Sequence, residues 1–166
     1  MASITFKGST VNTSGTLPEI GSKAADFKIT KTDLSDTSLA DYKGKKVVLN
    51  IFPSVDTGIC AASVRAFNTK ASNQENTVVL CISKDLPFAH TRFCEAEGLK
   101  NVIPASQYKN NSFEEAYHIT MTDGPLAGLF SRAVIILDEE GTVVYTEQVP
   151  EIVQEPDYDK AVAAIS

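Results

Sequence analysis

Two continuous apolar runs organise the pattern of hydrophobic and polar positions along the chain. Residues 45–51 (KKVVLNI) and 77–83 (TVVLCIS) have strand length and are rich in β-branched residues, which predicts strands buried on both faces. Between them the spacing becomes helical over residues 60–71. A third run, residues 132–138 (RAVIILD), is followed by a short turn and then by residues 142–147 (TVVYTE), which predicts a β-hairpin.

Shorter segments add further strands to this pattern. Residues 3–7 alternate apolar and polar side chains and are followed by Gly8, which predicts an N-terminal hairpin. Residues 26–30 (DFKIT) predict a strand that enters the main sheet, whereas residues 34–44 look like a turn-like connection that ends on a glycine. Residues 101–105 (NVIPA) predict a short strand whose proline indicates a sheet edge or a strand end.

Three segments outside the central runs predict further helices. Residues 86–97 (LPFAHTRFCEAE) place four apolar side chains on one face of a helix, namely Leu86, Ala89, Phe93 and Ala96. Residues 112–118 predict a short helix capped by Ser112, and residues 155–165 predict a terminal amphipathic helix. Strands that alternate with helices, then a hairpin and a closing helix, predict an α/β fold with a central mixed sheet flanked by helices. No linker divides residues 1–166, so we expect a single domain.

Composition and charge narrow the classes of partner. The 166 residues carry a formal net charge of −6 and show no basic patch, which argues against a nucleic-acid or anionic-membrane surface. No apolar run approaches the roughly 20 residues that span a bilayer. The first fifteen residues lack the basic flank and apolar stretch of a secretory signal, so we expect a cytoplasmic protein.

Cys60 stands where a predicted strand gives way to a helix. Pro53, Asp56, Thr57 and Gly58 mark the turn, and Asp56 or Thr57 can cap the helix. Unpaired backbone N–H groups and the helix dipole favour a negatively charged sulfur there. The alternative is a buried, inert cysteine. The position favours function, because open α/β folds place their ligand crevice at the carboxyl ends of the strands.

The other two cysteines have different patterns around them. Cys81 is embedded in an apolar strand and is expected to be a packing residue. Cys94 lies near the end of a predicted helix, where it either fills a gap or attacks an oxidised Cys60, which requires the two Cα atoms to come within about 7 Å. Three cysteines are too few for a disulfide scaffold, and the absence of a C-x-x-C motif disfavours a dithiol oxidoreductase of the usual thioredoxin type.

Arginines and histidines supply the remaining candidates. Arg132 begins an apolar strand, so its charge needs a partner, and a thiolate is one candidate. Arg65 either lies on a solvated helix face or turns partly towards Cys60. His90 and His118 are expected to be surface helix residues, because they have no metal-ligand spacing with the cysteines. No phosphate-binding glycine loop is present.

Four long segments carry a resemblance to a known family. Pro53, Thr57 and Cys60 form P-x-x-x-T-x-x-C, which resembles the peroxidatic motif of peroxiredoxins. The longer run NIFPSVDTGICAASVRAFN is similar to that of the bacterial thiol peroxidases, which are atypical two-cysteine peroxiredoxins. The resemblance continues through VVLCISKDLPFAHTRFCEAEGL, MTDGPLAGLFSRAVIILD and VPEIVQEPDY.

The resemblance implies a fold, a reaction and roles for five residues. It implies a thioredoxin-like fold with an N-terminal β-hairpin, a homodimer, and hydroperoxide reduction without a metal, flavin or haem cofactor. Cys60 matches the peroxidatic cysteine and Cys94 the resolving cysteine, while Pro53, Thr57 and Arg132 match the residues around the reacting sulfur. The expected cycle oxidises Cys60 to a sulfenic acid, forms an intramolecular disulfide with Cys94, and is completed by thioredoxin.

Two further expectations concern regulation. His90 stands where related sequences often carry Gln, and it lies four residues before Cys94, so it is a candidate to tune the resolving thiol. A competing hypothesis from another functional class is a non-catalytic redox sensor or interaction module, in which oxidation of Cys60 changes a docking surface. Turnover in the presence of a reductant separates a peroxidase from such a sensor.

Overall fold

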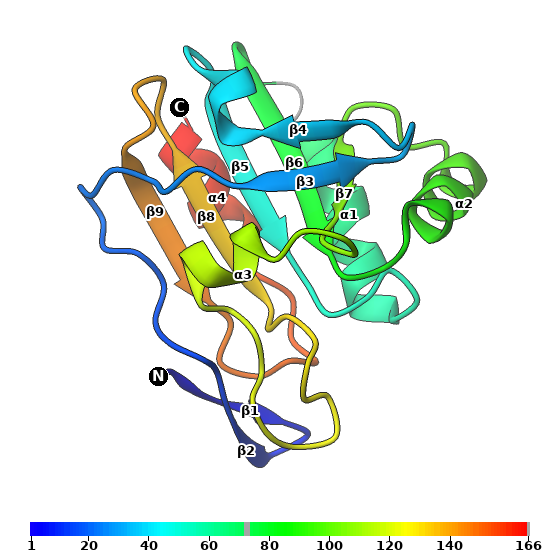
Figure 1. Ribbon diagram of the computed structural model, residues 1–166, viewed down its shortest axis with the longest axis vertical. Coiled ribbons are helices and arrows are strands. Elements are labelled where there is room, and N and C mark those ends of the chain that lie inside the picture. The colour runs from blue at the N-terminus through cyan, green and yellow to red at the C-terminus, as the bar shows by residue number, and fades with distance from the viewer. Residues whose placement is uncertain (72–73, 166) are drawn as a thin grey trace.

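The computed structural model describes residues 1–71 and 74–165. Within these residues seven strands form one mixed sheet in the order β4-β3-β7-β6-β5-β8-β9 (Figure 1). Their bounds are β3 (Lys28–Lys31), β4 (Asp36–Ser38), β5 (Lys46–Ile51), β6 (Thr77–Ser83), β7 (Ile103–Ser106), β8 (Ala133–Leu137) and β9 (Val143–Gln148). The predicted mixed sheet is therefore confirmed.

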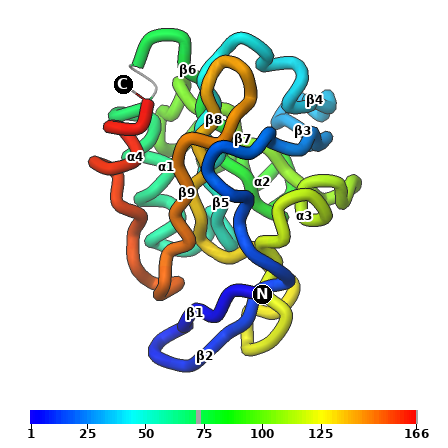
Figure 2. Tube along the Cα trace, turned by 90° about the vertical axis from the view of Figure 1, so that its left-hand side faces the viewer, coloured from blue at the N-terminus to red at the C-terminus, as the bar shows by residue number. Residues whose placement is uncertain are grey.

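Helices cover the sheet, and a separate hairpin extends the molecule. The helical elements are η1 (Leu39–Tyr42), α1 (Gly58–Lys70), α2 (Pro87–Glu97), α3 (Ser112–Tyr117) and α4 (Tyr158–Ile165). The predicted N-terminal hairpin, β1 (Ser3–Phe6) paired with β2 (Ser9–Asn12), projects beyond one end of the sheet (Figures 1 and 2). None of the helices in the described ranges is long and apolar enough to cross a membrane.

The strand directions decide which loops meet. Strands β5, β6 and β7 run parallel, whereas β8 runs antiparallel to β5. The carboxyl ends of β5 and β6 therefore lie at the same edge as the beginning of β8. At this edge the segment before α1, the connection from β6 to α2 and Arg132 converge, which is where open α/β sheets form ligand sites.

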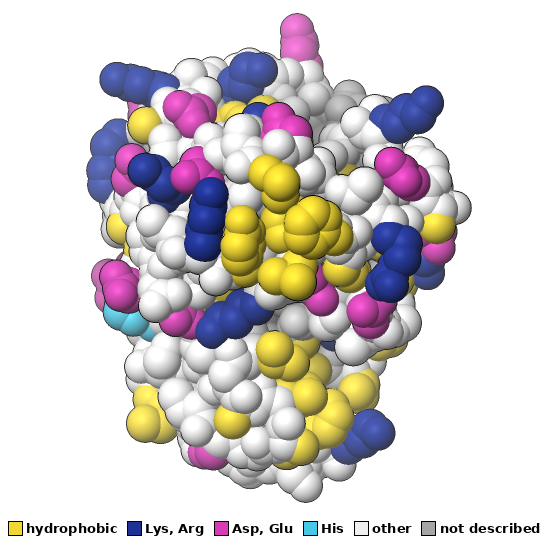
Figure 3. Space-filling view, turned by 45° about the vertical axis from the view of Figure 1, so that its right-hand side comes forward, with side chains coloured by type: hydrophobic (Ala, Val, Ile, Leu, Met, Phe, Trp, Pro, Cys, Tyr) yellow, Lys and Arg dark blue, Asp and Glu magenta, His cyan; other side chains and the backbone are white. Residues whose placement is uncertain are grey.

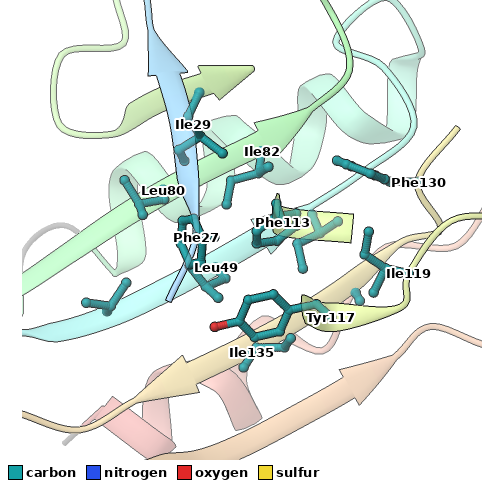
Figure 4. Close-up of a cluster of buried hydrophobic side chains, with 14 of the residues drawn as sticks. Phe27, Ile29, Leu49, Leu80, Ile82, Phe113, Tyr117, Ile119, Phe130 and Ile135 are labelled. Atoms are coloured by element: carbon teal, nitrogen blue, oxygen red, sulfur yellow. The ribbon is translucent and has the colours of Figure 1, made fainter. Parts of the chain in front are cut away.

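Alternating side chains on the central strands fill a core on each face of the sheet. In β5, Val47, Leu49 and Ile51 face the α3 side, and Val48 faces the α1 side. The α3 side is an aromatic cluster in which the rings of Phe27 and Phe113 meet edge to face at 4.9 Å (Figure 4). The α1 side takes up apolar residues of α1 and α4. Burial on both faces explains why β5 is a continuous apolar run.

The connection predicted for residues 34–44 contains regular structure. Strand β4 pairs antiparallel with β3, and the single helical turn η1 follows it. The sequence of β4, Asp-Thr-Ser, is short and polar, and only Thr37 in it is buried. Such a segment carries no apolar alternation, so the pattern did not reveal it.

The sheet-edge alternative for residues 101–105 is wrong. Strand β7 lies inside the sheet, between β3 and β6. Pro104 is tolerated because it lies near the beginning of β7, where β3 pairs only with Ala105 and Ser106. The missing N–H of Pro104 therefore costs no hydrogen bond to β3.

Two helix predictions need correction. Asn111, not Ser112, is the N-cap residue of α3, and the Ser112 hydroxyl instead accepts a hydrogen bond from the backbone N–H of Lys28 at 2.8 Å. On α2, Leu86 and Ala96 are exposed although both were placed on the apolar face. The buried residues of α2 are Pro87 and His90, and the 1% exposure of His90 contradicts its assignment to the surface. His118 is exposed, as predicted.

Candidate active site

Cys60 lies in the first turn of α1 with no exposed surface. Thr57 is the N-cap residue, and its hydroxyl oxygen accepts the Cys60 backbone N–H at 3.4 Å. The Ser63 hydroxyl donates to the Cys60 carbonyl at 2.8 Å. The predicted strand-to-helix junction is confirmed, and hydrogen bonds on both sides fix the backbone of Cys60.

Arg132 reaches the sulfur from the neighbouring strand. It directly precedes β8, where the two-residue period puts its side chain on the same face as Val134, towards α1. Its Nη1 donates to Cys60 Sγ at 3.2 Å, and its Nε donates to the carbonyl of Ile152 at 2.8 Å. The guanidinium is buried and favours a negative charge on the sulfur.

The loop before α1 is held by its own hydrogen bonds. The Thr57 hydroxyl donates to the carbonyl of Ser54 at 3.1 Å, and the Thr57 N–H donates to the same carbonyl at 3.3 Å. The hydroxyl hydrogen is therefore engaged within the loop. In this arrangement Thr57 caps the helix and does not donate to the sulfur.

A cavity of about 320 Å³ lies beside Thr57 and Arg132. Most of its wall is apolar, and the residues that line it are Phe6, Lys7, Pro53, Ser54, Thr57, Gly58, Ile59, Leu126, Leu129, Arg132, Ile152 and Val153. Cys60 itself does not line the cavity, but Thr57 and Arg132, which are hydrogen-bonded to it, do. Within the described residues, Nη2 of Arg132 has no hydrogen-bond partner, so it can bind an oxygen of a molecule in the cavity.

The N-terminal hairpin completes the cavity and supports Arg132. The Glu151 carboxylate accepts hydrogen bonds from the hydroxyl of Thr5 and the backbone N–H groups of Lys7 and Gly8. These bonds lower the pKa of Glu151 to about 2, and the bond from Thr5 contributes most. The next residue, Ile152, is the one whose carbonyl binds Arg132. The sequence did not reveal this link, because it joins segments more than 140 residues apart.

Cys81 and Cys94 lie in apolar surroundings and form no disulfide with Cys60. Burial raises the pKa of Cys81 to about 12, which fits its prediction as a packing residue. Cys94 is half-buried on α2, and burial raises its pKa to about 11. The structure therefore brings Pro53, Thr57, Cys60 and Arg132 together, while the Cys94 thiol remains protonated and unbonded.

A carboxylate that the sequence analysis did not single out binds the Cys60 loop. Asp85, between β6 and α2, accepts the Ser54 hydroxyl at 2.7 Å and the Val55 N–H at 2.9 Å. The sequence offered one indication of this role. Asp85 comes two residues after the end of β6, and β6 runs parallel to β5, so both strands end at the same edge of the sheet.

Other candidate groups have simple surroundings. Arg65 lies on the solvated side of α1 and pairs with Glu97 at 3.4 Å, so the alternative in which it turns towards Cys60 is wrong. No cluster of His, Cys, Asp and Glu side chains in the described part of the chain could hold a metal ion.

Comparisons with known proteins agree on one family. The Redoxin family profile matches residues 19–162. The chain is 53% identical to the thiol peroxidase of Corynebacterium glutamicum over the full length of both, and 53% identical to that of Mycobacterium tuberculosis over 99% of both. The crystal structure of a peroxiredoxin-like protein from Aquifex aeolicus superposes with a TM-score of 0.92 at 34% identity, covering 98% of this chain and 95% of that one. The predicted thioredoxin-like fold is confirmed, and the chain belongs to the redoxin family, among the thiol peroxidases.

Proposed function

We propose that this protein is a thiol-dependent peroxidase in which Cys60 reduces hydrogen peroxide and organic hydroperoxides. The Cys60 thiolate attacks one peroxide oxygen, the O–O bond breaks, and its electrons stay on the departing oxygen. That oxygen takes a proton and leaves as water or an alcohol, while Cys60 becomes a sulfenic acid. The step needs a negatively charged sulfur and donors for the departing oxygen.

The contact between Arg132 and Cys60 is the observation that carries this proposal. The 3.2 Å hydrogen bond from Nη1 places the permanent positive charge of the guanidinium beside the sulfur. Nη2 supplies a donor for a peroxide oxygen, and Thr57 caps the helix start, whose dipole favours negative charge there. Pro53 contributes a wall without an N–H, which shields the sulfur from water.

We assign the second step to Cys94. Its thiol attacks the Cys60 sulfenic sulfur, an intramolecular disulfide forms, and water leaves. Attack requires Cys94 to lose its proton, and the raised pKa shows that this is disfavoured while Cys94 stays packed on α2. The assignment therefore includes a rearrangement around α2 that precedes the disulfide.

A dithiol protein of the thioredoxin type would then return both cysteines to thiols. Such a partner needs an accessible surface beside the cysteines. Leu86 and Phe88, at the start of α2, are 51% and 66% exposed. Figure 3 turns the α2 side of the molecule towards the viewer, and hydrophobic side chains gather near the centre of this face. The resemblance that suggests this reductant also suggests a homodimer, and we propose a cytoplasmic location. Sedimentation analysis of the purified chain tests the dimer.

A steady-state assay tests the proposed function. The protein is supplied with thioredoxin, thioredoxin reductase and NADPH, and NADPH oxidation is followed with hydrogen peroxide, an alkyl hydroperoxide or a lipid hydroperoxide. We expect continuous turnover with at least one of them. A single oxidation of one chain equivalent without turnover contradicts the proposal and supports the redox sensor.

A further inference from the structure

A partly buried chain of hydrogen bonds connects the helix of Cys94 to the loop before Cys60. Its first member is His90, one turn before Cys94 on α2, whose Nε2 lies 3.1 Å from the Ser83 hydroxyl. The Ser83 hydroxyl donates to the Asp85 carboxylate at 2.5 Å and accepts the Asp85 backbone N–H at 3.1 Å. Since the single hydroxyl hydrogen goes to Asp85, His90 must be the donor to Ser83.

The chain continues from Asp85 to Cys60. The carboxylate accepts from Ser54 and Val55 in the loop before α1. The carbonyl of Ser54 accepts the Thr57 hydroxyl, and the Thr57 oxygen accepts the Cys60 N–H. Each member donates or accepts in a consistent direction, so the elements of both redox cysteines meet at one carboxylate.

A second tie between the same elements lies at the surface. Arg92 of α2 pairs with Asp56 at 2.7 Å, but both side chains are about two-thirds exposed at 66% and 67%. Exposed ion pairs contribute little, because water and salt screen them. The chain through Asp85 is less exposed than this ion pair, so we expect it to contribute more to the connection between α2 and the Cys60 loop, and the ion pair is its natural control.

We infer that Asp85 is a positioning residue for both cysteines: it fixes the Cys60 loop for reaction with peroxide and, through Ser83 and His90, holds α2 in place until the disulfide forms. The inference rests on the proposed function, because it concerns two successive steps of that reaction. The two roles oppose each other. A firm Asp85 network favours the first step and delays the second.

Variants along the chain separate these roles. Ser83→Ala removes the link to His90 and the two bonds between the Ser83 hydroxyl and Asp85, but it leaves the bonds that Ser54 and Val55 donate to the Asp85 carboxylate. We expect disulfide formation to become faster by about tenfold, with the oxidation of Cys60 unchanged within about twofold. Asp85→Asn weakens both sides, so we expect slower oxidation and faster disulfide formation. Arg92→Ala is the matched control and should change neither rate by more than about twofold.

The conservative substitution at His90 provides a rescue. His90→Gln keeps an amide donor for Ser83 and should retain the disulfide rate of the original protein. His90→Leu fills the site without a donor, so its disulfide rate should rise as in Ser83→Ala. A merely structural contribution to packing would not distinguish donor from non-donor.

Rapid mixing with one equivalent of hydrogen peroxide measures both rates. The reaction is stopped with denaturant and a thiol-alkylating reagent, and intact masses separate reduced, sulfenic and disulfide forms. Opposite changes of the two rate constants in Asp85→Asn, with acceleration of only the second in Ser83→Ala and His90→Leu, support the inference. It is overturned if these variants match Arg92→Ala, or if both rates change in the same direction.

Two readouts keep the test decisive. If Asp85→Asn does not fold, Ser83→Ala and the His90 pair still decide the role of the chain, together with hydrogen exchange of α2 amides, which should become faster in Ser83→Ala. If the original protein forms no sulfenic acid or disulfide, the proposed function has failed. If it forms both and the variants do not differ from it, only the positioning role has failed.

Discussion

Cys60 and Cys94 carry the same thiol into opposite surroundings. Cys60 is fully buried at the start of α1, with the guanidinium of Arg132 at 3.2 Å. Cys94 is half-buried near the end of α2, where burial raises its pKa to about 11. A helix start favours a negative charge and a helix end disfavours it. The two cysteines therefore differ in the charges and dipoles around them as well as in burial.

This difference teaches that burial alone does not make a cysteine inert. Cys81 is as buried as Cys60, but among the described residues its thiol accepts a hydrogen bond only from the Asn50 amide at 3.7 Å, and burial raises its pKa to about 12. The Cys60 sulfur instead accepts a hydrogen bond from the buried guanidinium of Arg132. A buried thiol becomes a nucleophile where the enclosing groups favour its charge.

Replacing the cysteines themselves should have the largest effect on peroxide turnover. We expect Cys60→Ser to lower peroxide turnover by about a thousandfold or more, because no other thiol has a cation beside it. Cys81→Ser is the control and should keep most of the activity. The coupled thioredoxin assay measures both. Activity retained in Cys60→Ser would contradict the assignment.

Replacing Cys94 tests the division of labour between the two cysteines. Cys94→Ser should consume one equivalent of peroxide per chain at the original rate and then stop, because no disulfide is available to the reductant. Peroxide consumption in the absence and presence of thioredoxin measures this. Sustained turnover with thioredoxin would show that another thiol resolves Cys60.

Removing the positive charge at Cys60 should make its surroundings more like those of Cys94. In Arg132→Met the sulfur loses its charged donor, and we expect the rate of Cys60 oxidation to fall by about a hundredfold. Arg132→Lys keeps the charge but loses the planar guanidinium that also binds the Ile152 carbonyl. Its oxidation rate should therefore lie between those of the original protein and Arg132→Met. Stopped-flow oxidation at several peroxide concentrations gives the rate constants. Equal rates in all three proteins would remove Arg132 from the mechanism.

The smallest expected effect concerns stability around α2. Burial lowers the pKa of His90 to about 4, against the opposing charge of Asp85, and the Phe52 ring packs beside it at 6.4 Å. The unfolded chain then binds more protons between about pH 6.5 and pH 4, so the free energy of unfolding falls as the pH drops through this range. The loss is at most about 3 kcal/mol. It is absent above about pH 6.5.

His90→Gln should flatten this dependence. Urea unfolding between pH 7 and pH 5 isolates the histidine, because carboxylates such as Glu151 titrate at lower pH. The original protein should lose stability over this interval and the variant should lose less. An identical slope in both proteins would mean that His90 is not held neutral in the fold.

Local features of the site could be predicted from the sequence. The apolar run of β5, the helical spacing after it and the N-cap Thr57 are neighbours along the chain, so they place Cys60 without any knowledge of packing. The contact of Arg132 could also be predicted in part, because a cation at the start of an apolar strand requires a partner. The alternation within β8 determines the face on which that partner must lie.

Long-range polar contacts could not be predicted in the same way. His90 was assigned to the surface because it has no metal-ligand spacing with the cysteines, but Ser83 at the end of β6 provides a buried acceptor. Asp85 resembles any polar residue of a connection until the register of β5 and β6 brings it to Ser54. The short strand β4 was missed since three polar residues show no period.

The most direct test of the central claim is the position of the first oxidation. The reduced protein is mixed with less than one equivalent of hydrogen peroxide in the presence of a reagent that traps sulfenic acids, and the adduct is located by peptide mass spectrometry. The electrostatic difference between the cysteines predicts an adduct at Cys60 alone at the earliest times. Adducts that form at Cys81 or Cys94 as fast as at Cys60 would contradict it.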